Sequence, residues 1–238
     1  MKYIKCFDNH QSYDELKNKS DYKEPLLCFC KDKQDVHFNE KYNNIKYVDM
    51  GLESGTLWAV KNVGSKNEVD YGLYFYWGDI NGYTLLDSDL FDIRTHPYKW
   101  YNTNNLAILE NENVIKYNNI DNKQILELTD DSAKHNMGKD WHMPVIEQFA
   151  ELIYSDNITY EFIENYNNSD INGLLFTSLV NNNTLFFPAS GYIYYNSFNI
   201  HDRNPKHLIN EAVILQSSCV YNNSFNLNDK LNYLSFNY

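Results

Sequence analysis

A stretch rich in glycine and aromatic residues, from Tyr47 to Asp79, constrains the fold more than any other part of the chain. It runs YVDMGLESGTLWAVKNVGSKNEVDYGLYFYWGD, so that short apolar and aromatic bursts alternate with single glycines. Glycine permits left-handed turns and close approach of two backbones. Short β-rich runs with this punctuation indicate a compact, loop-dominated β core and not a bundle of helices.

Three motifs resemble those of the Fibrobacter succinogenes major paralogous domain family. The first is VDMGLESGTLWAVKNVG followed by YGLYFYWGD, which resembles V-D-L-G-L-x-S-G-x-x-W-A-x-x-N-V-G and Y-G-x-Y-F-x-W-G. The second, WHMPVIEQFAEL, resembles W-R-M-P-T-x-x-E-F-x-x-L, with His142 and Val145 in place of Arg and Thr. The third, FFPASGY, resembles F-x-P-A-x-G-Y. The resemblance extends over residues 45–238 and is weakest over 195–238, where the usual Y-W-S-S-S appears only as Gln216–Cys219.

Periodicity and capping residues predict two short helices. One covers 130–138 and ends near Gly138, and the other covers 145–154, where apolar residues recur at i, i+3, i+4 and i+7. A β-hairpin is expected to turn at Asn181–Asn183, because asparagine tolerates left-handed conformations. The predicted strands of this hairpin and of the closing part of the chain are 173–178, 184–192, 211–216 and 233–236.

The W-x-M-P helix followed by hairpins also resembles the C-type-lectin-like fold, as in formylglycine-generating enzymes with their related R-L-P-T-E-x-E-W run. The resemblance implies an α+β fold for residues 45–238: a loop-rich antiparallel β domain with two short helices. Residues 1–44 are expected to form a small strand-and-hairpin docking module, with a strand within Tyr3–Phe7, a helix from Ser12 and a hairpin over 25–38. This N-terminal pattern resembles segments of virion proteins of Bacteroides phages, including crAss-like phages.

Composition describes a globular, acidic protein. Hydrophobic residues make up 43% of the chain and charged residues 22%, as in folded domains. The net charge of -12 argues against nucleic acid as a partner, because phosphate binding needs clustered cations. No stretch is apolar enough for a membrane span and the N-terminus lacks the apolar core of a secretory signal, so we expect synthesis in a cytoplasm and no membrane insertion. The few cysteines predict reduced, mostly buried thiols.

Several residues resemble fragments of metal or catalytic sites, and each has a plainer interpretation. The D-x-N-G sequences at 79–82 and 170–173 resemble pieces of calcium loops but lack the bidentate acid, so we interpret them as turns. The histidine spacings fit no zinc pattern. Cys219 has no adjacent cation or second thiol to activate it. We therefore expect no catalytic residue, no metal, no cofactor and no enzymatic activity.

Two clusters of tyrosine and asparagine late in the chain predict a ligand-binding surface. Tyrosine rings pack on sugars or on partner proteins, and asparagine supplies adaptable hydrogen bonds. The alternative interpretation is a β core with polar turns. The predicted ligand-binding residues are Tyr194, Tyr195, Asn196, Tyr221, Asn222 and Asn223.

These observations favour a structural protein of a phage virion, made in the host cytoplasm: a head fibre or decoration that displays a lectin-like domain to host-surface or gut glycans. Its expected partners are other virion proteins, either capsid or other fibre subunits, bound through residues 1–44. We expect a homo-oligomer, with a trimer favoured, because a symmetric particle offers repeated attachment points.

Three alternatives stay open from the sequence. One is a receptor-binding fibre of the phage tail. Another is a secreted carbohydrate-binding protein at the bacterial cell surface, which would need a signal sequence. The last is an enzyme of the formylglycine-generating type, which a second cysteine or a calcium cage would support.

Overall fold

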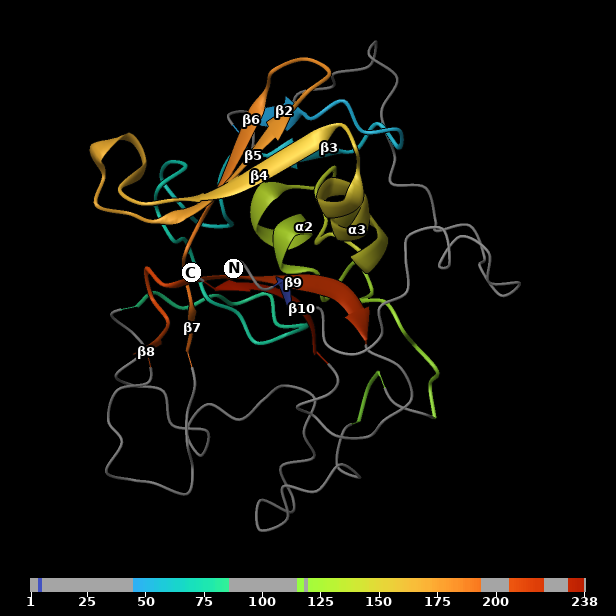
Figure 1. The fold of residues 1–238 in the computed structure, drawn as a ribbon. Coiled ribbons are helices and arrows are strands. Elements are labelled where there is room, and N and C mark those ends of the chain that lie inside the picture. The colour runs from blue at the N-terminus through green and yellow to red at the C-terminus, as the bar shows by residue number, and fades with distance from the viewer. Residues whose placement is uncertain are drawn as a thin grey trace.

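The chain folds as a mixed α+β structure with antiparallel sheets. The computed structural model describes residues 4–5, 45–85, 115–117, 120–193, 206–220 and 231–237. Two α-helices occur in these ranges, and they lie between two three-stranded sheets (Figure 1). The helices are α2 (Ser132–Met137) and α3 (Ile146–Tyr154), and one sheet contains β4 (Ile158–Ile163), β5 (Gly173–Ser178) and β6 (Thr184–Pro188). The other contains β1 (Ile4–Lys5), β10 (Leu231–Asn237) and β9 (Ala212–Val220) in that order.

Two small antiparallel pairs complete the architecture, and a 3-10 turn, η4, joins β4 to β5. The pair formed by Tyr47–Asp49 and Leu57–Ala59 lies next to the β5–β6 turn, because the side-chain amides of Asn181 and Asn183 both donate to the backbone oxygen of Asp49. These two hydrogen bonds occupy the Asp49 carbonyl oxygen. Without them it would be an unpaired acceptor at the end of a strand, where another chain could pair. The pairs are β2 (Tyr47–Asp49) with β3 (Leu57–Ala59) and β7 (Tyr192–Ile193) with β8 (Lys206–His207), and η4 covers Tyr166–Asn168.

Both predicted helices are confirmed, and their ends show why they form. The Asp131 carboxylate caps α2 by accepting from the Lys134 N–H at 2.9 Å, and Gly138 ends the helix with a φ of 112°. Val145 begins α3 without a capping oxygen, as its sequence predicts, although the Gln148 side chain accepts from the Val145 N–H at 3.0 Å. This bond supplies one half of a capping box.

The predicted hairpin is confirmed as β5 and β6. Asn182 lies in its turn with a φ of 60°, the left-handed conformation that asparagine tolerates. The second strand is shorter than predicted, because β6 ends at Pro188 and Gly191 turns the chain with a φ of 56° before β7 begins. Pro188 has no N–H to donate, and beyond it a further backbone bond, from the Ala189 N–H to the Asn172 oxygen at 2.7 Å, is made before the turn at Gly191.

The closing strands are also confirmed, as β9 and β10, and β1 joins them. Ile4 pairs with Phe236 and Lys5 with Ser235, so the two described residues from the start of the chain form an outer strand beside its end. Residues 6–44 lie outside the described ranges, so the division into modules 1–44 and 45–238 stays a prediction.

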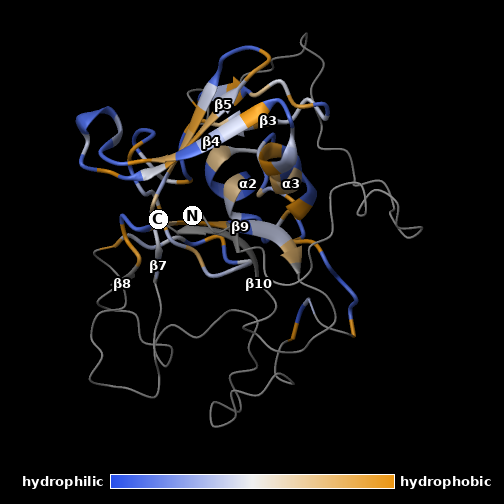
Figure 2. Ribbon diagram, in the orientation of Figure 1, coloured by the Kyte–Doolittle hydropathy of each residue, from blue (hydrophilic) through white to orange (hydrophobic). Residues whose placement is uncertain are grey.

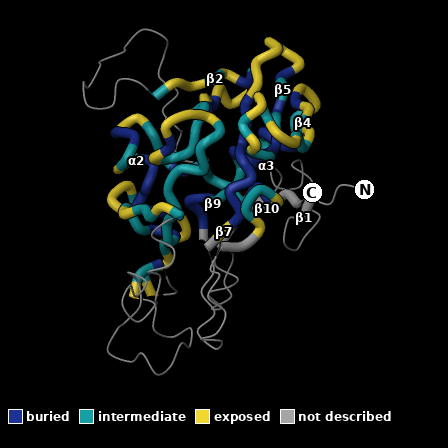
Figure 3. The backbone as a smooth tube through the Cα atoms, turned by 90° about the vertical axis from the view of Figure 1, so that its left-hand side faces the viewer, coloured by how far each residue is buried: buried dark blue, intermediate teal, exposed yellow. Residues whose placement is uncertain are grey.

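One hydrophobic core connects α3 with both three-stranded sheets. The Trp58 ring contacts the rings of Phe149 and Phe187, and Phe176 is fully buried. Figure 2 shows apolar residues on the elements that surround α3 and polar residues on the β4–β5 loop, and Figure 3 shows β9 and α3 as largely buried. The buried members are Met50, Leu52, Trp58, Phe149, Leu152, Ile153, Ile158, Leu174, Phe176, Leu185, Phe187, Ala189 and Val213.

A second, smaller core lies around α2 and contains Trp77, Tyr117, Leu126, Ala133, Met137 and Met143. Neither described helix is long and apolar enough to cross a lipid bilayer.

Candidate ligand-binding surface

The six predicted ligand-binding residues lie outside the described ranges, so only their flanking elements can be placed. Tyr194 follows β7 directly, and the chain just before β7 is bonded to the start of β9, where the Gly191 N–H donates to the Ala212 oxygen at 2.9 Å. Tyr221 follows the far end of β9. A nine-residue strand is about 26 Å long at the usual rise. The described residues that precede the two groups, Gly191–Ile193 and Val220, thus lie near opposite ends of β9, and the grouping of the six residues stays a prediction.

A different aromatic surface lies within the described ranges, on residues 74–83. Tyr74 and Tyr83 pair as an antiparallel bridge through two backbone hydrogen bonds of 2.8 Å. The Asp79 N–H donates to the Tyr76 oxygen at 2.9 Å and closes the turn between them. We call residues 74–83 the tyrosine hairpin.

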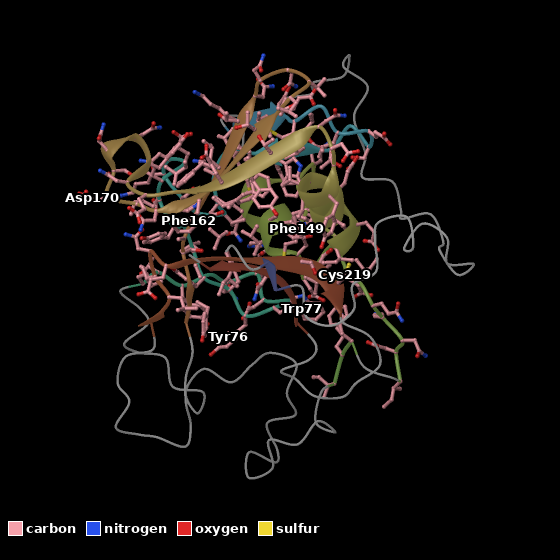
Figure 4. All side chains as sticks on the ribbon, in the orientation of Figure 1. Tyr76, Trp77, Phe149, Phe162, Asp170 and Cys219 are labelled. Carbon is pink, nitrogen blue, oxygen red and sulfur yellow. The ribbon has the colours of Figure 1, made fainter. Side chains whose placement is uncertain are left out.

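Three hydrogen bonds fix the tyrosine hairpin to distant elements. The Trp77 indole N–H donates to the Ser217 oxygen of β9 at 2.9 Å, and the Tyr74 hydroxyl donates to the Ser190 oxygen at 2.7 Å. On the other side, the Asn136 side chain of α2 donates to the Ile80 oxygen at 3.1 Å. Anchors on β9, on α2 and on the segment between β6 and β7 hold the hairpin in one position, which is the condition for a preorganised surface. Figure 4 shows Tyr76 on the side of β9 away from Phe149 and the main core.

The hairpin brings two tyrosine rings and a carboxylate together. The rings of Tyr76 and Tyr83 pack edge to face with centroids 6.3 Å apart, a favoured aromatic geometry. Burial raises the pKa of Tyr76 to about 12, and the neighbouring Tyr83 and Asp79 add to the shift. Burial and the Asp79 charge also raise the pKa of Tyr83. The Asp79 carboxylate therefore acts on both phenol groups, each of which is half-buried.

The D-x-N-G sequence at 79–82 forms a turn, as its sequence predicts. One oxygen of Asp79, Oδ1, accepts from the backbone N–H of Asn81 at 3.0 Å and from its side chain at 3.3 Å. A side chain at Gly82 would begin 2.7 Å from the Phe75 ring, so only glycine fits there. The local geometry of this sequence serves the turn and leaves the Asp79 side chain beside the two tyrosines.

The second D-x-N-G sequence, at 170–173, also forms a turn that braces two loops. The Asp170 N–H donates to the Asn165 side chain at 2.8 Å, and its backbone oxygen accepts from the Asn210 side chain at 3.1 Å. The Asn172 side chain donates to the Asn210 backbone oxygen at 3.0 Å. These amides are committed to holding the β4–β5 loop against the turn before β9.

An ion-pair network that the sequence analysis missed holds residues 115–117 to the start of α2. The Lys116 ammonium lies 2.5 Å from the Asp130 carboxylate and 2.6 Å from that of Glu127, and the Tyr117 hydroxyl donates to Asp130 at 2.6 Å. Burial works against the charged form of Lys116, but the hydrogen bonds to Asp130 and Glu127 raise its pKa overall. Because Asp130 and Tyr117 are buried and paired with each other, we assign the network a structural role.

Cys219 is buried in the structure, and its chemistry fits the inert thiol that the sequence predicts. Burial raises its pKa to about 11, and the nearby Glu147 charge adds to the shift. A thiol with a raised pKa is a poor nucleophile at neutral pH, because the thiolate is the reactive form.

The run YGLYFYWGD resembles a family motif, but its tyrosines were not among the predicted ligand-binding residues. The available signal was the aromatic run 74–77 followed directly by an Asx turn.

Comparisons of the chain with protein-family models, with curated proteins and with solved structures give no match.

Proposed function

We propose that this chain is a structural protein of a phage virion, a head fibre or decoration, which displays a C-type-lectin-like domain that binds host-surface or gut glycans. The family resemblance of residues 47–79 and the phage-like pattern of residues 1–44 support this proposal. The α+β architecture with antiparallel sheets and two short helices is compatible with it.

The observation that carries the proposal is the way in which the motif-bearing segment is fixed in place. The Glu151 carboxylate of α3 accepts from the Ser54 N–H at 2.8 Å and from its hydroxyl at 2.6 Å. Trp58 fills the main core, and Trp77 is bonded to β9. The segment is thus tied to the helices and to both sheets, as a rigid platform for display requires, because preorganised surfaces lose little entropy on binding.

The chemistry of the titratable groups supports recognition over catalysis. The raised pKa of Cys219 disfavours a role for its thiol. The net charge of -12 suits a displayed, soluble surface and disfavours binding to nucleic acid.

Attachment to the particle is assigned to residues 1–44, which would contact capsid or other fibre subunits, in a homo-oligomer for which we favour a trimer. Ile4 and Lys5 pair with β10, so we assign the attachment itself to residues 6–44. Symmetric particles present repeated sites, which is why an oligomer is expected.

The location is tested by mass spectrometry of phage particles purified by density gradient from cultures that produce this chain. We expect its peptides to co-purify with the major capsid protein, and gold-labelled antibody against the full chain to decorate the heads. Label on the tails would favour the tail-fibre alternative. Particles that lack the chain while the cell lysate contains it would rule the proposal out.

A further inference from the structure

We infer that the tyrosine hairpin is the saccharide-binding surface of this protein, that Tyr76, Tyr83 and Asp79 carry it, and that it takes an uncharged sugar without calcium. This inference rests on the proposed glycan-binding function and specifies its site and its ligand class. It assigns the ligand to described residues and not to the two tyrosine–asparagine clusters predicted from the sequence.

The two tyrosines supply aromatic rings of the kind that pack against sugar rings. Both rings are half-buried, so part of each is fixed by packing while part reaches solvent. Their edge-to-face arrangement, with centroids 6.3 Å apart, sets two ring planes at a steep angle. Aromatic faces pack against the C–H face of a sugar, and a rigid ring loses little conformational entropy when it does so.

Asp79 and Asn81 supply the polar contacts. The turn occupies Oδ1 of Asp79, and within the described ranges no other residue hydrogen-bonds to its second oxygen. Asn81 is exposed next to it. A carboxylate oxygen and an amide side by side can accept from and donate to neighbouring hydroxyls of one sugar, and a bond to a charged acceptor is stronger than one between neutral groups.

The charge at the hairpin selects the class of sugar. The Asp79 carboxylate influences both tyrosines and would repel a sialic acid, a uronic acid or a sulfated sugar at close range. A bound calcium ion could reverse that preference, but calcium takes six to eight oxygen ligands. Among the residues that the structure describes, no group of three or more potential metal ligands lies together, and one oxygen of Asp79 is committed to the turn, so we assign binding to direct hydrogen bonds and to the rings.

The test measures binding of the full chain to an array that carries uncharged, sialylated, uronic and sulfated glycans, with and without the chelator EDTA. The variants are Tyr83→Ala, which removes one ring, and Asp79→Asn, which keeps an oxygen for the turn but removes the charge. Tyr47→Ala is the matched control, because Tyr47 is 61% exposed and lies on β2, on the opposite side of the helices from β9 (Figure 1). Circular dichroism verifies that each variant is folded.

We expect binding to uncharged glycans that EDTA does not change. Tyr83→Ala should weaken it about tenfold, the equivalent of one aromatic contact, and Tyr47→Ala should leave it unchanged. Asp79→Asn should admit acidic glycans that the natural chain rejects.

Three results would overturn the inference alone: binding that survives Tyr83→Ala in a folded variant, binding that EDTA abolishes, or a preference of the natural chain for acidic glycans. Binding to no glycan at all would overturn the glycan-binding part of the proposed function as well. The virion location would then be judged separately from the purified particles.

Discussion

At the scale of single residues, Asp131 connects α2 to the segment that leads into α3. Its two carboxylate oxygens accept from the N–H groups of Lys134 at 2.9 Å and Met143 at 2.8 Å, and the residue is 2% exposed. Asp131→Ala removes a helix cap and leaves a buried N–H without a partner, so we expect the free energy of unfolding to fall by about 2–4 kcal/mol. Urea titration measures it. Asp140→Ala, at an exposed site, is the control, and a loss equal to that of the control would contradict the role of Asp131.

The tyrosines make the native state sensitive to alkaline pH. Burial raises the pKa of Tyr76 and of Tyr117 to about 12, from an unperturbed value of 10.0. Above pH 10 the unfolded chain releases phenolic protons that the folded chain retains, so this contribution to stability is complete below pH 10 and is lost as pH rises toward about 12. We expect urea midpoints to decrease over this interval. Ultraviolet difference absorbance should show late-ionising tyrosines in the folded protein, and ionisation of every tyrosine near pH 10 would contradict the prediction.

At the scale of elements, the start of α3 lacks one capping bond. Val145 has the extended backbone of a helix N-cap, with φ -78° and ψ 162°, but no side-chain oxygen. Val145→Thr would supply a hydroxyl where Gln148 already completes the other half of a capping box, so we expect a gain of about 1 kcal/mol. Thermal unfolding of the natural chain, Val145→Thr and Val145→Ala measures it. Equal changes in the two variants would show that the hydroxyl makes no cap.

The elements that could be predicted are those fixed by local chemistry. Asp131 and Gly138 delimit α2, the apolar spacing defines α3, and Asn182 forms the turn between β5 and β6. The predicted closing strand 211–216 was too short, because β9 continues through a Ser-Ser-Cys run without an apolar alternation. Backbone bonds to distant segments hold that extension: Leu126 donates to the Ser218 oxygen, and the Ser218 N–H donates to the Pro144 oxygen, both at 2.8 Å.

The candidate site was predictable only in the part that local chemistry fixes. The Asx turn at 79–82 follows from its four residues. The grouping of Tyr76, Tyr83 and Asp79 depends on the bridge between Tyr74 and Tyr83 and on anchors from β9 and α2. The bridge is local, but the anchors join residues that are 140 and 56 positions apart, and periodicity within a short window does not detect such contacts.

At the scale of the whole molecule, the start of the chain completes the sheet that contains its end. β1 pairs with β10 through Ile4 and Lys5, although the sequence assigns these residues to the docking module. Deleting residues 1–5 would leave one edge of β10 unpaired, so we expect the free energy of unfolding to fall by about 1–2 kcal/mol, the value of a few backbone hydrogen bonds. The exposed edge should also promote association at high concentration.

A matched pair of variants separates backbone pairing from the loss of chain length. Replacing Ile4 and Lys5 together by proline removes their N–H donors, whereas replacing both by alanine keeps them. We expect the proline variant to resemble the deletion and the alanine variant to remain closer to the natural chain, in urea titration and in light scattering. In that case the first five residues belong with residues 45–238, and only 6–44 remain for attachment to a particle. If the deletion and both variants are as stable as the natural chain, β1 contributes nothing to the domain and the whole of residues 1–44 is available as a separate module.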